Sequence, residues 1–434
     1  MEGHEKMEKI VSLCKRRGFI FQGSEIYGGL SGTWDYGPLG VALKNNIQNL
    51  WWKMFVSDRE DMYGVDAAIL MNEKVWEASG HTGAGFADPL SECEKCKKRF
   101  RSDHLESKEK CPDCGGKLGE EKVFNLLFPV AMGAQGDTKS YLRGETAQGM
   151  FVNFKNVVDT MRPKLPFGMA QIGKAFRNEI APRDFVFRTR EFGQMEIEYF
   201  IEESAWEKEF EKWRESVWSW IDALGLSRDN VKEFEVPKDD LAHYSKRTID
   251  FEYNYPGKGF DELLGLAYRT DHDLKGHMEA SGEKLLYTPA EGAPFVPHVI
   301  EPSFGLERAV MAVLSESYLE DEMGGESRVV LRLPAHLAPI RVAVFPLLKN
   351  KPELVEKARE VFTMLKKEFG NVVWDDNGNV GKRYRRQDEI GTPFCITVDF
   401  DTLEDETVTV RDRDTGKQDR VTISNLILLL TQKI

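Results

Sequence analysis

Residues 173–200, GKAFRNEIAPRDFVFRTREFGQMEIEYF, constrain the fold of this chain more than any other stretch. Residues 194–199 alternate polar and apolar side chains, which predicts a β-strand with one polar and one apolar face. Before a charged loop, Arg177 and Glu179 are two residues apart and would point the same way from a second strand. If the polar faces of the two strands adjoin, the surface between them holds both signs of charge. Such a surface suits a ligand that is both cationic and anionic.

The size and composition of the chain place it among ordinary soluble proteins. Its 434 residues allow two or three domains with a large core, and 30% of them are charged against 41% hydrophobic. No apolar run is long enough to cross a membrane, so we expect no membrane partner. The N-terminus MEGHEKMEKI is charged and does not resemble a signal peptide, which makes a cytoplasmic location the default expectation.

The charge of the chain limits how it could bind nucleic acid. The net charge of −13 argues against binding through the whole surface. One local basic stripe remains possible, at GKRYRR, residues 381–386. Taken alone, such a run is more typical of a solvated helix face.

Prolines at 334 and 339 predict a domain boundary. Beyond it we expect strands at 341–346 and 372–375, a helix at 353–369, a short helix near Arg383, two more strands and a last helix. This alternation indicates a small α/β domain over residues 334–434. Residues 1–333 form the other domain, with a compact insertion at 91–122. After Pro38 a long helix carries an apolar stripe, which could face either its own core or a second subunit.

Four cysteines have the spacing of a metal knuckle. Cys93 and Cys96 form one C-x-x-C, and Cys111 and Cys114 form the second, followed by two glycines. Each pair can direct two thiolates at one ion, so the pattern predicts a closed, structural Zn²⁺ site. Four reduced thiols or two disulfides are the alternatives, and the cytosol disfavours disulfides. The remaining cysteines, at 14 and 395, read as buried free thiols.

Three separated motifs resemble those of class II aminoacyl-tRNA synthetases. They are YGPLG before the long helix, FRNE…FRTREFGQME, and EPSFGLERAVMAV, where Gly-x-x-Arg opens a helix. Two further stretches, YLRGETAQGMFVNF and GKRYRRQDEIGTPFCITVD, resemble the glycyl enzymes of the α2 type, as do EASGHTGAGFADPL and FRSDHL. The resemblance covers about residues 20–430. It departs from the family at Gly144, where proline is usual.

The resemblance implies a fold and an activity. The fold would be α+β, with an antiparallel-sheet catalytic domain that carries the zinc-knuckle insertion, and a C-terminal α/β anticodon-binding domain. The activity would be that of a glycine–tRNA ligase, which makes glycyl-adenylate and pyrophosphate from glycine and ATP and then transfers glycyl to the 3′ end of tRNA(Gly). The expected partners are ATP with Mg²⁺, glycine, tRNA(Gly) and a second copy of the chain, since the first motif forms the subunit interface in that family.

The resemblance also assigns residues to ATP. Arg177 and Arg308 are the expected catalytic cations, on the α-phosphate and the γ-phosphate, because guanidinium bonds phosphate bidentately and stays charged. Glu262 could hold Mg²⁺ or be a plain cap acid. We expect His272 and His277, nearby, to be ordinary polar residues. The full ATP set is Arg177, Asn178, Glu179, Phe187, Arg188, Arg190, Phe192, Glu262, Leu263, Gly305, Glu307 and Arg308.

The expected glycine site supplies carboxylates for the substrate ammonium. Its residues are Arg101, Glu145, Phe192, Gln194, Glu196, Glu301 and Ser303. The stretch at 173–200 would thus mix charges because an ammonium and phosphates must lie side by side. For tRNA, the resemblance and the basic stripe together indicate Lys382, Arg383, Tyr384 and Arg386, with Arg385 among them, since cations beside an aromatic ring suit single-stranded bases.

Other functions remain possible from the sequence. A prolyl or threonyl enzyme of the same subgroup is one, although RGETAQG and EPSFG match the glycyl pattern better. A synthetase-like binding protein without catalysis is another, and it should have lost Arg177 and Arg308. A zinc-dependent nucleic-acid binder fits least, because the knuckle is a small insertion.

Overall fold

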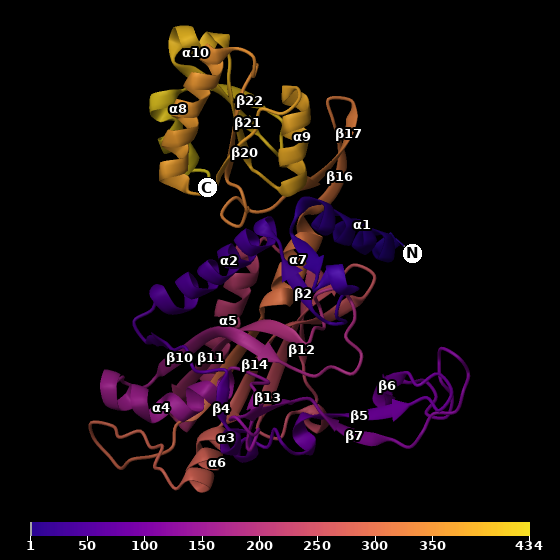
Figure 1. The fold of residues 1–434 in the computed structure, drawn as a ribbon. Coiled ribbons are helices and arrows are strands. Elements are labelled where there is room, and N and C mark those ends of the chain that lie inside the picture. The colour runs from indigo at the N-terminus through magenta and orange to yellow at the C-terminus, as the bar shows by residue number, and fades with distance from the viewer. Residues whose placement is uncertain (1) are drawn as a thin grey trace.

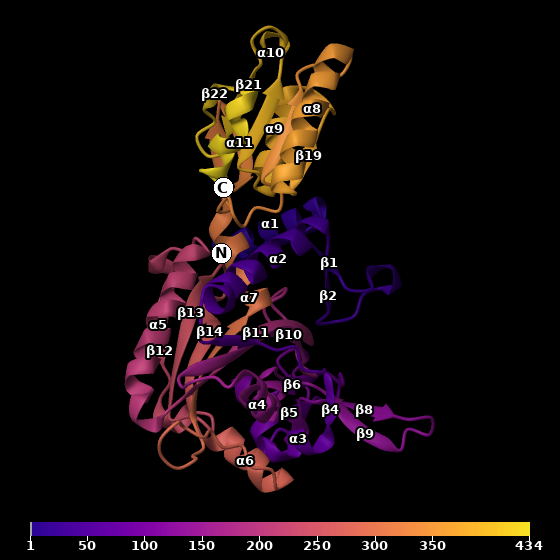
Figure 2. The same cartoon turned by 90° about the vertical axis from the view of Figure 1, so that its left-hand side faces the viewer.

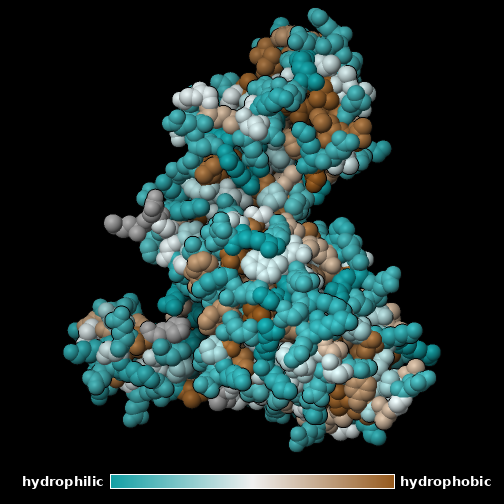
Figure 3. Space-filling view, turned by 180° about the vertical axis from the view of Figure 1, so that it is seen from behind, coloured by the Kyte–Doolittle hydropathy of each residue, from teal (hydrophilic) through white to brown (hydrophobic). Residues whose placement is uncertain are grey.

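The computed structural model describes residues 2–434 and contains a large body and a separate C-terminal domain. Figures 1 and 2 show the C-terminal domain at one end of the large body, and Figure 3 shows a waist between the two and a small lobe that projects from the large body. Within the described residues, no helix is long and apolar enough to cross a membrane.

A seven-stranded sheet is the centre of the large body. Its strand order is β12-β13-β14-β15-β11-β10-β3, and all neighbours are antiparallel except β3 and β10. The antiparallel sheet expected from the sequence is therefore confirmed. The strands are β3 (Met62–Gly64), β10 (Phe167–Phe176), β11 (Glu191–Ile201), β12 (Val231–Glu235), β13 (Arg247–Tyr255), β14 (Gly259–Thr270) and β15 (His298–Gly305).

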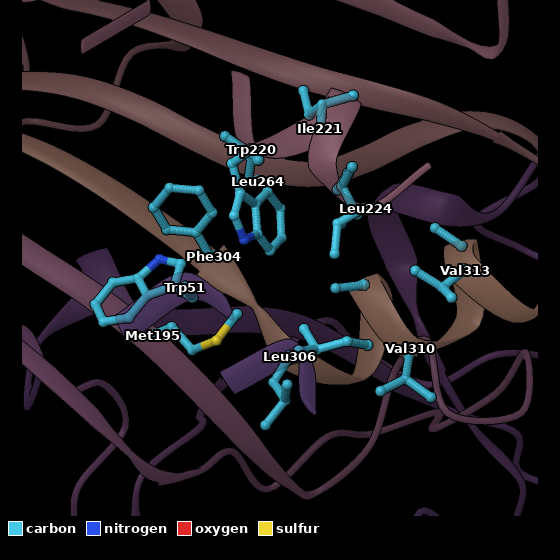
Figure 4. Close-up of a cluster of buried hydrophobic side chains, with 14 of the residues drawn as sticks. Trp51, Met195, Trp220, Ile221, Leu224, Leu264, Phe304, Leu306, Val310 and Val313 are labelled. Carbon is cyan, nitrogen blue, oxygen red and sulfur yellow. The ribbon is translucent and has the colours of Figure 1, made fainter. Parts of the chain in front are cut away.

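Helices cover both faces of this sheet (Figure 1). The main core lies between one face and α1 (Glu2–Arg17), α2 (Pro38–Trp52), α5 (Trp206–Ala223) and α7 (Leu306–Ser317). A smaller apolar cluster joins the opposite face to α4 (Ala147–Met161) and α6 (His272–Ser281). Figure 4 shows Trp51, Trp220 and Phe304 together in the main core, where the rings of Trp51 and Trp220 meet Phe304 edge-on. These contacts fix the position of β15 and of α7, which follows it.

The apolar stripe of α2 faces the core of its own chain. Leu43, Ile47, Trp51 and Phe55 are buried in the main cluster, and a π-helical turn at Lys53–Ser57 extends the helix so that Phe55 reaches it. The stripe is therefore explained without a second subunit.

Several small sheets surround the central one. The projecting lobe is built on β5 (Ala87–Glu92), β6 (Arg99–Arg101) and β7 (Lys122–Asn125), with the cysteine loops at its end. A second sheet joins β4 (Leu70–Asn72), β8 (Phe128–Met132) and β9 (Thr138–Leu142), and α3 (Glu73–Ala78) follows β4. A two-stranded ladder, β1 (Ile20–Gln22) with β2 (Trp34–Tyr36), precedes α2.

The C-terminal domain is a five-stranded mixed sheet with helices on both faces, as the alternation predicted. Its order is β19-β18-β20-β21-β22, with parallel pairing on both sides of β18. The strands are β18 (Val342–Pro346), β19 (Val372–Trp374), β20 (Phe394–Val398), β21 (Thr407–Asp412) and β22 (Gln418–Thr422); the helices are α8 (Pro352–Phe369), α9 (Val380–Ile390), α10 (Phe400–Asp405) and α11 (Ile423–Thr431). The sequence reading missed α10 and β22, which are short.

Ion pairs join the two parts of the molecule. A hairpin of β16 (Tyr318–Met323) and β17 (Glu326–Leu331) reaches α9, where Arg328 Nη1 lies 3.1 Å from Asp388 Oδ2, both side chains being buried. Arg16 and Arg17 at the end of α1 both pair with Glu389 of α9. The C-terminal domain is thus attached to the large body through α9.

Candidate active site

A cleft of about 430 Å³ lies where β11 begins and β15 ends, against the start of α7. The loop between β10 and β11 forms one wall, and β5 and β6 of the projecting lobe form another. Many residues predicted from the sequence line it together: Arg101, Arg177, Glu179, Phe187, Arg188, Phe192, Gln194, Glu262, Ser303, Gly305, Glu307 and Arg308. The structure therefore brings the second and third motifs to one place.

The Gly144 backbone and two aromatic rings hold the Arg177 side chain in the cleft. Its Nε donates to the Gly144 carbonyl oxygen at 3.1 Å, and its guanidinium lies 5.2 Å from the centre of the Phe86 ring and 5.4 Å from that of Phe192. Aromatic faces favour a cation that is partly removed from water. The side chain is thus fixed as a positive group facing the cleft.

Gly144 is required for this packing. A Cβ atom at this position would lie 2.6 Å from Cζ of Phe86 and 3.1 Å from Cδ2 of Leu127. The space that a larger residue would occupy is filled by the Phe86 ring that covers Arg177. The departure from the family pattern therefore has a packing partner in this chain.

Arg308 lies in the first turn of α7 and lines the cleft. Its Nη1 lies 2.9 Å from Glu262 Oε2, and its guanidinium lies 4.7 Å from the centre of the Phe187 ring. The neighbouring Glu307 accepts from the backbone N–H of Gly193 at 2.6 Å and so fixes β11 against the helix. Burial raises the pKa of Glu307.

Beneath the cleft floor lies a layer of buried acids, which we call the acid layer: Glu145, Glu196, Glu198 and Glu301. All of them are under 10% exposed. Glu196 accepts from the hydroxyls of Thr146 and Ser303, the latter at 2.7 Å. The polar face predicted for this strand is buried on β11, because it forms the inside of a site.

Partners balance part of this negative charge. Glu145 lies 3.1 Å from His81 Nε2 and accepts from Gln148 at 3.0 Å. Burial alone would raise the pKa of Glu145, but His81, Arg269 and Gln148 together hold that pKa below its usual range. Glu301 accepts from Arg269 Nη1 at 2.6 Å.

Arg269 is the buried cation of the acid layer, and the sequence analysis missed it. It is 1% exposed, pairs bidentately with Asp273 at 2.7 and 2.9 Å, and lies 3.8 Å from the centre of the Tyr244 ring. Thr146, Gln148 and His81 were missed as well. His81 lies in EASGHTGAGFADPL, and Thr146 and Gln148 lie in YLRGETAQGMFVNF, both stretches that resemble the family. Nothing in the pattern around Arg269 distinguishes it from a surface strand charge.

Some predicted residues do not line the cleft. Leu263 is buried in the core, and the Asn178 backbone N–H donates to the Leu126 carbonyl. Arg190 turns away, because its guanidinium donates to the carbonyls of Ser31 at 2.8 Å and Glu179 at 3.2 Å. Arg190 braces the loop that carries Arg188. His277, predicted to be an ordinary polar residue, is hydrogen-bonded to Gln148.

The four knuckle cysteines converge at the end of the projecting lobe. Their sulfur atoms all lie within 4.8 Å of one another, with Cys93 to Cys114 at 3.5 Å and Cys96 to Cys111 at 3.7 Å. These separations are too long for disulfide bonds and fit four thiolates around one ion. At Gly115 the backbone has φ +67°, so the glycine makes the tight turn that the second pair needs.

The basic stripe of the C-terminal domain requires a correction. Arg383 is 1% exposed and donates to the carbonyl oxygens of Pro346, Asp376 and Gly378, so this guanidinium supports the fold and does not face solvent. Its neighbour Arg386 pairs with Asp375, and Tyr384 donates to or accepts from Thr397. Among the predicted tRNA contacts, Lys382 is exposed. The sequence did not show that Arg383 is buried, because only the folded domain shows which side of α9 packs against the sheet.

A larger hollow, of about 780 Å³, lies between α1, the 184–185 turn and the turn after β13. Most of its lining surface is apolar, and although Lys258 pairs with Asp184 there at 3.0 Å, none of the residues predicted for ATP or glycine lines it. The smaller cleft is therefore the better candidate for chemistry.

Comparison with known proteins agrees with this geometry. Residues 131–318 match the family model of the tRNA synthetase class II core domain (G, H, P, S and T), and residues 341–433 match that of the anticodon binding domain. The fold and the cleft thus define a class II aminoacyl-tRNA synthetase.

Relatives narrow the class. The chain is 49% identical to a glycine–tRNA ligase of Caldanaerobacter subterraneus subsp. tengcongensis, over 99% of this chain and 98% of that protein. It is 49% identical to the Clostridium tetani glycine–tRNA ligase over the full length of both, and 50% identical to that of Streptomyces coelicolor over 97% of each. The chain belongs to the glycine–tRNA ligase family.

Proposed function

We propose that this chain activates glycine with ATP, releasing pyrophosphate, and transfers the glycyl group from the adenylate to the 3′ end of tRNA(Gly). The observation that carries the proposal is the arrangement of charge in one cleft. Fixed arginines line the cleft, and the acid layer lies beneath its floor. The reaction joins an amino acid to ATP, so the site needs acids for the ammonium group and, beside them, cations for the carboxylate and the phosphates. Glycine-dependent exchange between pyrophosphate and ATP tests it.

Activation transfers the α-phosphorus of ATP from pyrophosphate to the glycine carboxylate. The attacking carboxylate oxygen and the phosphate oxygens are all negative, so fixed cations must meet them as charge develops. Arg177, held by Gly144 and two rings, meets the α-phosphate and the carboxylate in this proposal. Arg308 meets the γ-phosphate of a bent ATP. Phe192 stacks on adenine.

The acid layer and the cleft floor provide the glycine site. Glu145, Glu196 and Glu301 attract the ammonium, and Gln194 and Ser303 lie above them at the cleft surface. Ser303 is bonded to Glu196, so the floor is rigid and leaves little space for a side chain on the substrate. Overpacking such a site costs about 1–3 kcal/mol, which would exclude alanine.

Two metals fit the residues present. Glu262 offers a carboxylate at the cleft, where a bound Mg²⁺ would neutralise phosphate charge; its present partner is Arg308. The four knuckle cysteines offer a closed thiolate set, so the Zn²⁺ they would hold is structural and stabilises the lobe that contributes Arg101 to the cleft.

The remaining proposals concern partners. The C-terminal domain holds the anticodon end of tRNA, with Lys382 among its contacts. The chain forms a homodimer in the cytoplasm; because the α2 stripe is internal, the interface uses other surfaces of the first-motif region. Sedimentation equilibrium at micromolar concentration tests the dimer, and a monomer there would refute it.

A further inference from the structure

One member of the acid layer has no role in the mechanism above. Glu198 lies on β11 two residues beyond Glu196, so both side chains project from the same face of the strand. It is 0% exposed, and no residue in the described part of the chain donates a hydrogen bond to either of its carboxylate oxygens. An ionised carboxylate buried in this way is strongly disfavoured.

Its neighbours are acids that do have donors. Carboxylate oxygens of Glu196, Glu198 and Glu301 lie within 4.8 Å of one another. Glu196 accepts from Thr146 and Ser303, and Glu301 accepts from Arg269. Carboxylates this close disfavour one another's ionisation, so a proton is favoured within the group. Glu198 is the member that gains least from being ionised.

The charges around Glu198 come from four elements. Glu196 shares its strand, Glu301 is on β15, Arg269 on β14 and Asp273 at the start of α6. Burial raises the pKa of Glu198 well above its usual range, and Glu301 raises it further. Arg269 opposes these effects, but its guanidinium is already engaged by Asp273 and Glu301.

We propose that Glu198 is a positioning residue of the glycine site: it keeps its proton at neutral pH and, as a neutral acid, donates to Glu196 or Glu301. The two neighbours then remain ionised and correctly oriented for the substrate ammonium, without a further negative charge in the layer. The identity of that substrate rests on the proposed function, whereas the protonation of Glu198 does not.

Two substitutions test whether Glu198 acts as a neutral hydrogen-bond donor or as a negative charge. Glu198→Gln keeps a neutral donor of the same length, so glycine KM and kcat should stay within about threefold of wild type. Glu198→Met keeps the length and removes the donor, and glycine KM should rise about tenfold or more while ATP KM is unchanged. The matched control is Glu209→Met, a buried glutamate on α5 that pairs with Lys212 and should leave glycine KM unchanged.

Infrared spectroscopy gives a readout that needs no turnover. At pH 7 the wild-type protein minus Glu198→Gln should show the carbonyl absorption of one protonated carboxylic acid. If that band appears while glycine exchange is absent, the proposed function fails and the protonation stands. If Glu198→Met does not fold, the Gln variant and the spectrum still decide the matter.

Three results would overturn the proposal. One is a difference spectrum without the protonated-acid band. Another is a Glu198→Gln variant whose glycine KM rises tenfold, because a charge would then be required. The last is a metal ion, one per chain, that is lost in Glu198→Gln and retained in Cys111→Ser, since a cation and not a proton would then occupy the group.

Discussion

Arg308 Nη1 lies 2.9 Å from the Glu262 carboxylate and 3.1 Å from the Glu262 carbonyl oxygen, at the wall of the cleft. The cation predicted to meet a phosphate is therefore already positioned by Glu262, the acid for which the sequence left open Mg²⁺ binding and a plain capping role. A triphosphate that reaches Arg308 must share the guanidinium with Glu262 or displace the Glu262 carboxylate from it. The pair orients the guanidinium before ATP binds, which lowers the cost of reorganisation during the reaction.

Removing either motif arginine should suppress adenylate formation. Arg177→Ala and Arg308→Ala each delete one preorganised donor to a developing charge, a loss of about 3 kcal/mol, or about a hundredfold in rate. Pyrophosphate exchange with saturating glycine measures it. Arg228→Ala is the control, because Arg228 is exposed, contacts Asp222 and the Trp218 ring, and does not line the cleft. Near-normal exchange in either motif variant would remove these residues from the mechanism.

Asp250 should make stability depend on pH. Burial, Glu262 and Glu252 raise the pKa of Asp250 to about 7, against the opposing effect of Arg308. From about pH 4 upward the unfolded chain loses this proton, whereas the folded chain keeps it until about pH 7. The free energy of unfolding therefore falls as pH rises from about 4, and the loss is complete once pH has passed about 7. Because asparagine does not ionise, Asp250→Asn should not show this loss of stability.

Calorimetry should show that the melting temperature of Asp250→Asn, relative to wild type, rises between about pH 5 and 7 and levels off by about pH 8, just above the pKa of about 7. A difference that is flat across that range would show that Asp250 ionises normally.

The sequence predicted the arrangement of motifs better than it predicted burial. The cleft residues at 177, 192, 194, 303 and 308 are brought together as expected, because each motif carries its own local signal, such as Gly-x-x-Arg at a helix start. Arg269 could not be predicted in the same way. Its importance comes from Asp273, Glu301 and Tyr244, which only the folded sheet and α6 bring to it.

The knuckle cysteines should hold one zinc ion per chain. Cys111→Ser removes one of four converging thiolates, so metal analysis should find less than stoichiometric zinc and the lobe should unfold locally. Because the lobe carries Arg101 to the cleft wall, glycine activation should weaken too. Cys395→Ser is the matched control, a buried free thiol outside the cluster. Full zinc content in Cys111→Ser would exclude this ligand set.

Arg383 and Lys382 should separate stability from tRNA binding. Arg383→Ala leaves three carbonyl oxygens short of a donor, one of them in a buried hydrogen bond, so the C-terminal domain should lose about 3 kcal/mol of stability. Lys382 is exposed, so Lys382→Ala should melt normally, bind tRNA more weakly and show a salt dependence shallower by about one contact. If Arg383→Ala melts normally but loses tRNA affinity, the original prediction of a solvent-facing basic stripe that includes Arg383 would be right.

The sequence could not reveal this difference between neighbouring residues of one helix. A run of cations gives no sign of which one turns inward, and it is the loop at 376–378 and the end of β18 that supply the carbonyls for Arg383. The same limit applies to the stripe of α2, whose spacing fits a core and an interface equally well.

Exchange of labelled pyrophosphate into ATP, measured with each of the twenty amino acids in turn, tests the central claim most directly. The cations and the acid layer predict exchange that depends on glycine, with alanine slower by at least about tenfold because its methyl group overpacks the floor at Ser303. Exchange that is equal with alanine, that prefers proline or threonine, or that is absent with glycine would contradict the account.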